Sequence, residues 1–253
     1  MNRKRADQKM NDKQTIVITG ASKGLGRALT LAFAKQKARL AICARGEKDL
    51  MKVKKEAEAL GAEVLAVPAD VSKAADVDRF ISLTEISYST IDVLINNAST
   101  IGPSPIPFLA DTTEEDFQKV LQANTIGPFL ITKRVLAGML SRGAGSIINV
   151  TSEAGNTGYA GWGTYGISKF ALEGMTETWA DEVQDTGVRV NMVDPGEMDT
   201  EMHDLAVPDC DYEIGKPEDS VDVFIYLASE ESSKVNGQRF RAQEFALTNK
   251  GAV

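Results

Sequence analysis

The sequence predicts an α/β fold, a doubly wound parallel β-sheet with helices on both faces. Short β-branched, apolar runs alternate with longer helix-forming stretches along nearly the whole chain, which is the order of elements in such sheets. The runs are apolar at successive positions and not at every second one, as expected of parallel strands covered on both faces. Of the 253 residues, 43% are hydrophobic and 25% are charged, a composition typical of globular domains.

The elements follow one another from strand to helix. The predicted strands are residues 15–19, 39–44, 63–67, 92–96, 146–150, 189–193 and a last one near 238–242. The predicted helices run to residue 37 after the first strand, then over 48–60, 74–89, from 113 onward, about 163–184 and about 218–229. Gly61 suits a helix end. A capping box of Thr112 and Glu115 begins the long fourth helix, and Gly127-Pro128 interrupts or bends it.

Charge and composition exclude several classes of protein. We expect a disordered basic leader, residues 1–13, followed by one domain, residues 14–253, because no linker divides the chain. A net charge of −8 is unfavourable for binding nucleic acid or an anionic membrane. Two cysteines and one histidine predict neither a disulfide framework nor a metal site. No apolar run reaches the roughly 18 residues of a membrane span, and we expect a cytoplasmic protein.

A glycine-rich segment, Thr19-Gly-Ala-Ser-Lys-Gly-Leu-Gly26, joins the first strand to the first helix. Glycines let a backbone turn tightly and approach a ligand closely, and a helix N-terminus attracts phosphate. The segment therefore predicts a nucleotide-binding loop, formed by Gly20, Ser22, Lys23, Gly24, Leu25 and Gly26. A plain strand-to-helix turn is the alternative.

The end of the second strand, Cys43-Ala-Arg45, favours a phosphorylated ribose. An acidic residue at this place would bind the ribose 2′-hydroxyl of NAD, whereas this chain has a small neutral residue and then a cation. A guanidinium donates two parallel hydrogen bonds to a phosphate, and Lys23 adds a second positive charge. We therefore expect NADP(H) to be preferred over NAD(H), unless Arg45 is merely a solvated loop residue.

Tyr165 and Lys169 are four residues apart in a predicted helix, so they share one helix face. A neighbouring cation lowers the pKa of a phenol from its ordinary value of about 10, and a positively charged nicotinamide would lower it further. Such a tyrosine can exchange a proton near neutral pH. Ser152 follows the fifth strand, and its hydroxyl can donate to a substrate carbonyl oxygen. Taken singly, these patterns also fit a chance pair on an exposed helix and a serine in a local turn.

Together the motifs resemble the short-chain dehydrogenase/reductase family, in its compact type without large insertions. The resemblance runs from about Thr15 to Phe240 and includes the glycine-rich segment, Asp70-Val71, Asn96-Asn-Ala98, Asn124, Ser152, Tyr165, Lys169 and Pro195-Gly196. It implies a Rossmann-type sheet of about seven strands. It also implies an NADPH-dependent carbonyl reductase or alcohol dehydrogenase, which transfers hydride between the nicotinamide and a ketone or 3-oxo group.

The resemblance assigns roles residue by residue. Tyr165 would be the acid in reduction and the base in oxidation. Lys169 would lower the pKa of Tyr165 and bind the nicotinamide ribose, and Ser152 would hold the substrate oxygen. Asn124, in the long helix, would support a water molecule of a proton relay. The further cofactor contacts it implies are Asp70 and Val71 at the adenine, Asn97 and Ala98 after the fourth strand, Pro195 and Gly196 at the nicotinamide, and Thr200 at its carboxamide.

Four further residues are candidates for substrate binding: Glu153, Tyr159, Trp162 and Glu197. The carboxylates would recognise a polar or cationic group, or else be solvated. The aromatic rings would wall the site, or else pack against the next helix. The short acidic segment after Thr200 indicates a fairly open pocket and disfavours a strongly anionic substrate.

The chain departs from the family pattern in two places. Ser99 stands where the family's Asn-Asn-Ala-Gly has glycine, and we expect it to be tolerated because it need not adopt a positive φ. The chain ends in Arg239-Phe-Arg-Ala-Gln-Glu-Phe245 and eight further residues, where many relatives have an Asp-Gly-Gly end that helps to build a tetramer. A homo-oligomer is implied, and a homodimer through the long helices is favoured over a homotetramer.

Two other functions remain open at this point. A catalytically silent regulator that binds NADP(H) would be expected to have lost the tyrosine, lysine or serine, and all three are present. A redox-neutral epimerase or dehydratase of the same family commonly has a longer substrate region than this chain.

Overall fold

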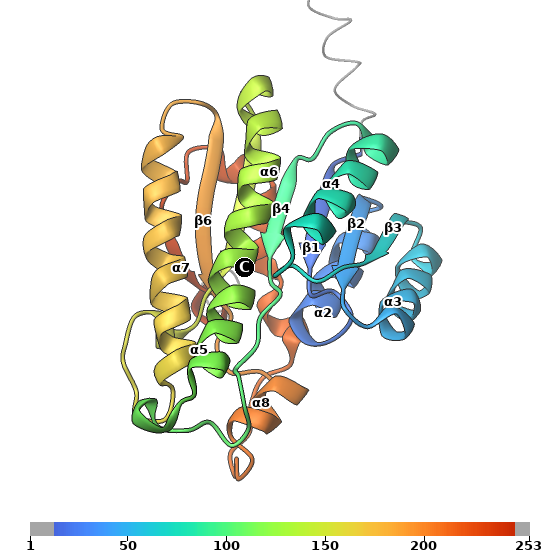
Figure 1. The fold of residues 1–253 in the computed structure, drawn as a ribbon. Helices are drawn as coiled ribbons and strands as arrows, with labels where there is room; N and C mark the ends of the chain where they lie inside the picture. The colour runs from blue at the N-terminus through green and yellow to red at the C-terminus, as the bar shows by residue number, and fades with distance from the viewer. Residues whose placement is uncertain (1–12, 246–253) are drawn as a thin grey trace, which may run out of the picture.

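The computed structural model describes residues 13–245. Within them lies a seven-stranded sheet in the order β3-β2-β1-β4-β5-β6-β7, in which every pair of neighbours is parallel (Figure 1). The strands are β1 Thr15–Thr19, β2 Arg39–Ala44, β3 Glu63–Pro68, β4 Val93–Asn96, β5 Gly145–Val150, β6 Val188–Asp194 and β7 Arg239–Arg241. This confirms the predicted doubly wound sheet. Except for Lys13, the predicted leader lies outside the described residues.

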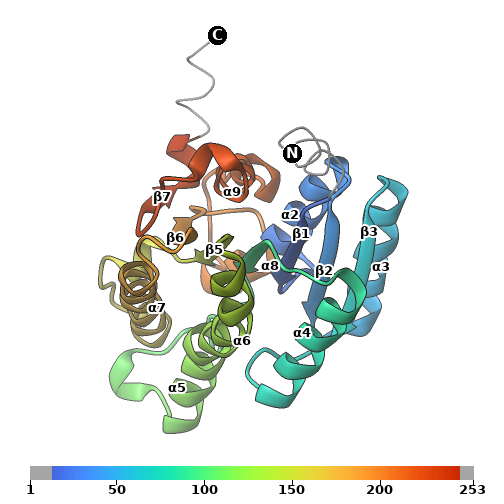
Figure 2. The same cartoon turned by 90° about the horizontal axis from the view of Figure 1, so that it is seen from above.

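Helices cover both faces of the sheet, as Figure 2 shows. One face carries α2 Gly24–Lys35, α3 Glu47–Ala59 and α9 Asp222–Ala228. The other carries α4 Ala74–Tyr88, α6 Gly127–Arg142 and α7 Gly163–Glu182, while α5 Glu114–Leu121 leads into α6 and α8 Glu201–Ala206 lies near the strand ends. Alternate residues of β1 feed the two cores: Ile16 packs with Phe33 on the first face, and Val17 packs with Phe80 on the second.

The long fourth helix begins and continues differently from the prediction. Its N-cap is Thr113, whose hydroxyl accepts a hydrogen bond from the Asp116 amide, so the predicted capping box of Thr112 and Glu115 is wrong by one residue. A π-helical turn, Gln122–Ile126, separates α5 from α6. The Gly127 N–H donates to the Gln122 carbonyl oxygen at the end of this turn, and Pro128 follows in the first turn of α6.

No helix among residues 13–245 combines the length and the apolarity needed to cross a membrane. The same residues hold no group of three or more His, Cys, Asp or Glu side chains placed to bind a metal ion.

A chain of buried polar side chains ties the middle of the sheet to the helices. The Asn96 amide donates to Asn149 Oδ1 at 2.8 Å and to Thr132 at 3.0 Å, and the Asn149 amide donates to Thr176 at 2.8 Å. These contacts join β4 and β5 to α6 and α7 inside the core. These hydrogen bonds also fix how deeply α7 packs against the sheet, and α7 carries the predicted catalytic pair, Tyr165 and Lys169.

We predict that Asn149→Ala lowers the free energy of unfolding by about 1–3 kcal/mol, since it leaves buried partners without hydrogen bonds. Urea denaturation measures the loss. The exposed Asn156 provides the matched control, for which Asn156→Ala should change stability by less than about 0.5 kcal/mol. Equal losses in the two variants would contradict the role given to Asn149.

Candidate active site

The carboxyl ends of β1, β2, β4, β5 and β6 open on one cleft of about 1280 Å³. Sites for a single small ligand usually measure about 300–1,000 Å³, so the cleft has room for two ligands. Its wall contains Gly20, Ser22, Lys23, Gly24, Leu25, Gly26, Arg45, Asp70, Val71, Asn97, Ala98, Ser152, Glu153, Tyr159, Trp162, Tyr165, Lys169, Pro195, Gly196, Glu197 and Thr200. Of the residues predicted for the site, Asn124 alone is absent from this wall.

The glycine-rich loop places the N-terminus of α2 at one end of the cleft. Gly20 has a φ of +66°, and a Cβ on Gly26 would lie 2.2 Å from the Gly20 carbonyl oxygen, so neither position accepts a side chain without strain. No side chain caps α2, since Lys23 at the N-cap makes no capping hydrogen bond. The first N–H groups of the helix are therefore free to donate to an anion in the cleft.

Polar contacts brace this loop from behind. The Asn97 side-chain amide donates to the carbonyl oxygens of Thr19 and Gly20, at 2.8 and 3.2 Å. The Thr19 hydroxyl accepts from the amides of Asn97 and Ala98, at 3.0 and 2.9 Å. Asn97 thus lines the cleft while its side chain fixes the loop, a task that the sequence analysis did not assign to it.

The two predicted phosphate-binding cations differ in their surroundings. Arg45 is exposed at the end of β2, and within residues 13–245 it forms no hydrogen bond or ion pair. Lys23 forms an ion pair with Glu201 of α8, across the cleft from the glycine-rich loop. Only Arg45 therefore has its full donor capacity available for a ligand in this structure.

Asp70 and Thr200 line the cleft with side chains already engaged locally. Asp70 Oδ1 accepts from the Ser72 amide and hydroxyl, at 3.1 and 2.7 Å. The Thr200 hydroxyl caps α8 and accepts from the His203 amide at 3.3 Å. Both side chains hold the backbone beside the cleft, so a ligand would meet a preformed surface at these positions.

Tyr165 lies on the inner face of α7 and is 8% exposed. Burial raises the pKa of its phenol to about 12, a hydrogen bond with the Ser152 side chain lowers it, and the negative charge of Asp194 raises it. The pKa of the phenol is therefore raised and not lowered as predicted, and Lys169 is not among the groups that shift it. The phenol is held as a neutral proton donor.

Lys169 is 2% exposed, and its ammonium donates to the Val150 carbonyl oxygen at 2.8 Å. The Nζ atom lies 5.5 Å from the centre of the Tyr165 ring, so spacing along the helix does bring the pair together. Burial lowers the pKa of Lys169 to about 8, while the charges of Asp194 and Glu173 act to raise it. This amine can release a proton close to neutral pH.

Ser152 follows β5 and caps a short 3-10 turn, Glu153–Gly155. Its oxygen accepts from the Ala154 amide at 3.3 Å. A hydroxyl that accepts in this way still has its own hydrogen to donate. Ser152 can therefore make the local turn bond and also donate to a ligand oxygen beside the phenol.

Asn124 lies in the π-helical turn and not in a regular stretch of helix, and its side chain is engaged by neighbouring residues and is not part of the cleft wall. Its Oδ1 accepts from the Thr100 amide at 2.8 Å, and its amide donates to the Thr100 carbonyl at 2.8 Å and to the Ser168 hydroxyl at 3.0 Å. The side chain thus supports the segment after β4 and the base of α7.

The end of the cleft beyond Tyr165 has a mixed apolar and acidic lining. The Trp162 ring meets Tyr165 edge to face with 5.8 Å between ring centres, and Ile101, Met202 and Ala206 pack in the same cluster. Glu197 accepts from the Tyr212 hydroxyl at 3.1 Å. Tyr159 is 47% exposed, which fits an open rim.

Two residues that the sequence analysis treated only as departures also belong to this region. The Ser99 side chain lowers the pKa of Tyr165, although its buried hydroxyl makes no hydrogen bond of regular geometry within the described residues. As expected, Ser99 is not among the residues with positive φ. Arg239 of β7 reaches the carbonyl oxygen of Ser152. The sequence signal that could have indicated this contact is the presence of two arginines, Arg239 and Arg241, in a predicted strand of a sheet expected to be apolar.

Residues 14–210 match the family model of the short chain dehydrogenases. The chain is 36% identical over 232 residues to the 3-oxoacyl-[acyl-carrier-protein] reductase FabG of Thermotoga maritima, covering 88% of this chain and 93% of that protein. The chain belongs to the short chain dehydrogenase family and is an oxidoreductase.

Solved structures agree with this assignment. The levodione reductase structure superposes with a TM-score of 0.86 at 27% identity, covering 92% of this chain and 98% of that chain. A short chain dehydrogenase from Shigella flexneri complexed with NADP superposes with a TM-score of 0.85 at 28% identity, covering 92% and 98%.

We predict a pH-dependent stability difference between the wild type and Lys169→Met. The pKa of Lys169 is lowered from 10.5 to about 8 in the folded protein. Between those values the unfolded chain binds a proton that the folded chain does not, so wild-type stability rises with pH. Relative to Lys169→Met, the wild type should gain up to about 1.4 kcal/mol per pH unit over this range.

Urea denaturation at several pH values measures this slope. Lys55→Met, at an exposed position of α3, serves as control and should show no such slope. A flat difference for Lys169→Met would mean that the buried amine keeps its ordinary proton affinity.

Proposed function

We propose that the protein is an NADPH-dependent carbonyl reductase, or the reverse alcohol dehydrogenase, acting on a ketone or 3-oxo group. The observation that carries the proposal is the buried Tyr165 phenol, with the Ser152 hydroxyl and the Lys169 ammonium beside it at the wall of the cleft. The names of a 3-oxoacyl reductase and a levodione reductase among its relatives support a carbonyl substrate.

The residues of the cleft fit a dinucleotide. The uncapped N-terminus of α2 and its glycines would hold the pyrophosphate, Arg45 would hold the 2′-phosphate, and Asp70 and Val71 would lie at the adenine. Asn97 and Ala98 would lie along the middle of the cofactor, and Pro195, Gly196 and Thr200 at the nicotinamide. When bound, the nicotinamide exchanges a hydride with the carbonyl carbon.

The chain's own residues would manage the proton and the substrate oxygen. Ser152 donates a hydrogen bond to the carbonyl oxygen and polarises it. Tyr165 gives its proton to that oxygen as negative charge develops, and its high pKa keeps the proton in place until then. Lys169, whose pKa is about 8 and whose Nζ atom lies 5.5 Å from the centre of the Tyr165 ring, would then supply a proton to the phenolate. In oxidation the same groups act in reverse.

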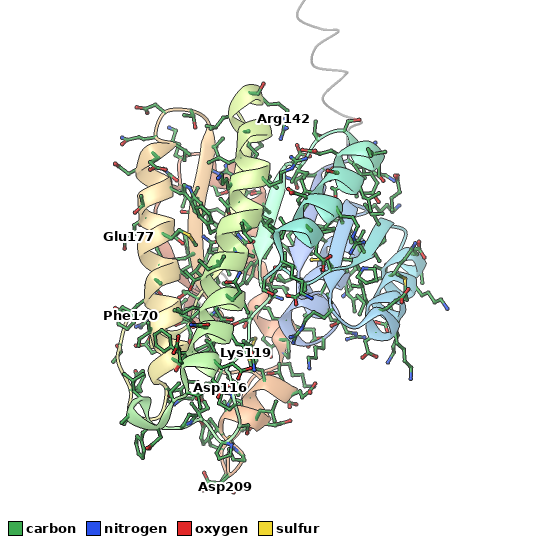
Figure 3. The ribbon with its side chains drawn as sticks, viewed as in Figure 1. Asp116, Lys119, Arg142, Phe170, Glu177 and Asp209 are labelled. Atoms are coloured by element: carbon green, nitrogen blue, oxygen red, sulfur yellow. The ribbon has the colours of Figure 1, made fainter. Side chains whose placement is uncertain are left out.

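The same proposal extends to the residues that contact the substrate and to the oligomeric state. Glu153, Tyr159, Trp162 and Glu197 would contact the substrate. Exposed apolar side chains on α6 and α7, including Phe129, Ile167 and Phe170, favour a second copy of the chain as partner; Figure 3 shows Phe170 pointing outward from α7. A homodimer in the cytoplasm, with neither nucleic acid nor membrane as partner, is the proposed form.

We predict that Tyr165→Phe removes at least about 99% of NADPH-dependent turnover, because general acid catalysis contributes about 10²-fold or more. NADPH affinity should change less than threefold, since the ring remains. Absorbance at the nicotinamide band measures turnover with a panel of ketones and β-keto esters, and NADPH fluorescence measures binding.

Tyr226→Phe removes a phenol on α9, outside the cleft wall, and serves as the matched control with unchanged turnover. Activity retained in Tyr165→Phe would refute the proton-donor role. Saturable NADPH binding by the wild type without turnover of any substrate would favour the silent regulator.

We predict that Arg45→Ala weakens NADPH binding by about tenfold or more, since a charge-assisted fork to phosphate is lost. NADH binding should change less than threefold. Titration of nicotinamide fluorescence gives both dissociation constants. Lys52→Ala, on the exposed surface of α3, should affect neither cofactor, and an equal loss of both cofactors in Arg45→Ala would show that Arg45 does not read the 2′-phosphate.

A further inference from the structure

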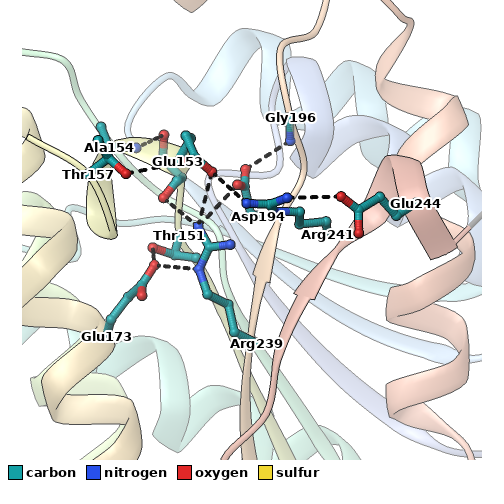
Figure 4. Close-up of polar contacts among 11 residues, drawn as sticks. Thr151, Glu153, Ala154, Thr157, Glu173, Asp194, Gly196, Arg239, Arg241 and Glu244 are labelled. Carbon is teal, nitrogen blue, oxygen red and sulfur yellow. Dashed lines mark hydrogen bonds and ion pairs between the residues drawn. The ribbon is translucent and has the colours of Figure 1, made fainter. Parts of the chain in front are cut away.

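Arg239, Glu173 and Asp194 form a cluster of largely buried ionic groups (Figure 4), of which Asp194 also lines the cleft. Its centre is Arg239, whose side chain is 19% exposed and forms no part of the wall itself. Nη2 donates to the Ser152 carbonyl at 3.0 Å and to Asp194 Oδ2 at 3.1 Å, and Nε donates to Glu173 Oε1 at 3.1 Å. One guanidinium thus contacts three groups from three different segments.

Each of these segments carries part of the reaction centre. The Ser152 carbonyl belongs to the residue whose hydroxyl faces Tyr165. Asp194 Oδ1 accepts from the Gly196 amide at 3.0 Å, so it shapes the turn after β6. Glu173 follows Lys169 by four residues on the same face of α7, and it accepts from the Thr151 hydroxyl at 2.6 Å. Arg239 therefore fastens the ends of β5 and β6 to the catalytic helix.

The cluster is also an electrostatic neighbour of the catalytic pair. The charged groups around that pair are Asp194 on β6, Glu173 on α7, Arg239 on β7, and Glu153, whose carboxylate lies 4.0 Å from Arg239. Arg241 on β7 is a second, more exposed cation, 3.5 Å from Glu153 and in electrostatic contact with Asp194. The negative charges of Asp194 and Glu173 act to raise the pKa of Lys169, and Asp194 does the same to Tyr165. The side chains of Asp194 and Glu173 are only 7% and 12% exposed, so water screens them weakly.

We propose that Arg239 is a positioning residue for proton transfer, holding Ser152, Asp194 and Glu173 in place and neutralising the two buried carboxylates behind Tyr165. The inference rests on the proposed function for its catalytic part. A lysine cannot replace the guanidinium, because one ammonium lacks the planar fork that spans three partners. The role also accounts for a largely buried arginine in the last strand of the sheet.

Four variants separate geometry from charge. Arg239→Lys keeps the charge but loses the fork, and Arg239→Gln loses both. Asp194→Asn removes one carboxylate, and the double variant Asp194→Asn/Arg239→Gln removes one charge of each sign, so it remains informative if Arg239→Gln fails to fold. Arg189→Gln is the control: Arg189 is half-buried on β6 and donates to the Leu227 carbonyl, away from the cleft.

The first measurement is the pH profile of kcat/KM for NADP⁺-dependent alcohol oxidation, in which Tyr165 must act as a base. Arg239→Gln should move the midpoint upward by about half a pH unit or more, because uncompensated carboxylates oppose the phenolate. The double variant should return toward the wild type. Arg239→Lys should keep the midpoint but lose about tenfold or more in kcat, since small displacements of reacting groups are costly, with KM changed less than threefold.

The second measurement needs no catalytic activity. Nuclear magnetic resonance of labelled lysine side chains, with Lys169 assigned from Lys169→Met, follows the titration of that amine. Its pKa should rise by about half a unit or more in Arg239→Gln and stay at the wild-type value in Arg189→Gln. If the wild type turns over no carbonyl or alcohol, the proposed function fails, while this titration still tests whether Arg239 controls the charge around Lys169.

The outcomes are distinct. A shifted lysine titration, a shifted pH profile and its reversal in the double variant support the proposal. The proposal is overturned if the Lys169 titration and the midpoint of the pH profile are unchanged in every Arg239 variant and Arg239→Lys keeps full kcat. Arg239 would then only anchor β7 to the rest of the sheet.

Discussion

Burial of the Tyr165 phenol and the Lys169 ammonium at the end of β5 is the constraint on which the site depends. Removal from water favours the neutral form of each group, so the pKa of the phenol rises to about 12 and that of the amine falls to about 8. The two pKa values therefore move apart, from 10.0 and 10.5 to about 12 and about 8, so the ammonium is the stronger acid and transfer of its proton to a phenolate is favourable. The bond from Lys169 to the Val150 carbonyl holds the amine at this depth. The hydroxyls of Ser152 and Ser99 and the carboxylates of Asp194 and Glu173 then shift these pKa values by less than burial does.

Much of the fold and of the cleft wall could be predicted because both follow from short-range pattern. The ends of β1 and β2 fall at the predicted residues, and each of the other strands differs from the prediction by one residue at one or both ends. Once the strands are parallel and their carboxyl ends share an edge, residues such as Arg45, Ser152 and Gly196 must gather there. The i,i+4 spacing likewise places Lys169 beside Tyr165. These inferences require the order of the elements and their handedness, but no side-chain packing.

What the sequence did not reveal depends on contacts between distant segments. Spacing alone indicates that Tyr165 and Lys169 are neighbours, but it does not tell how little water reaches them, so the predicted sign of the pKa shift of Tyr165 was wrong. The ion pair of Lys23 with Glu201 requires α8 to lie over the glycine-rich loop. Asn124 is not part of the cleft wall, because its side chain is engaged by Thr100 in the segment after β4 and by Ser168. None of these arrangements has a local signature in the chain.

The last strand, β7, lies at an edge of the sheet and also carries a residue, Arg239, that contacts the candidate active site. β7 pairs only with β6 among the described strands, and edge strands commonly carry charged residues that discourage pairing with another chain. Arg241 fits that task, since it is half exposed and pairs with Glu244 and Glu153. Arg239 lies on the same face of the strand, two residues earlier, and it reaches the ends of β5 and β6 and α7, where its partners Ser152, Asp194 and Glu173 lie far from it in sequence. The buried carboxylates of Glu173 and Asp194 meet the charge of Arg239 only when β7 has paired with β6. The site therefore depends on the last strand of the sheet being in place.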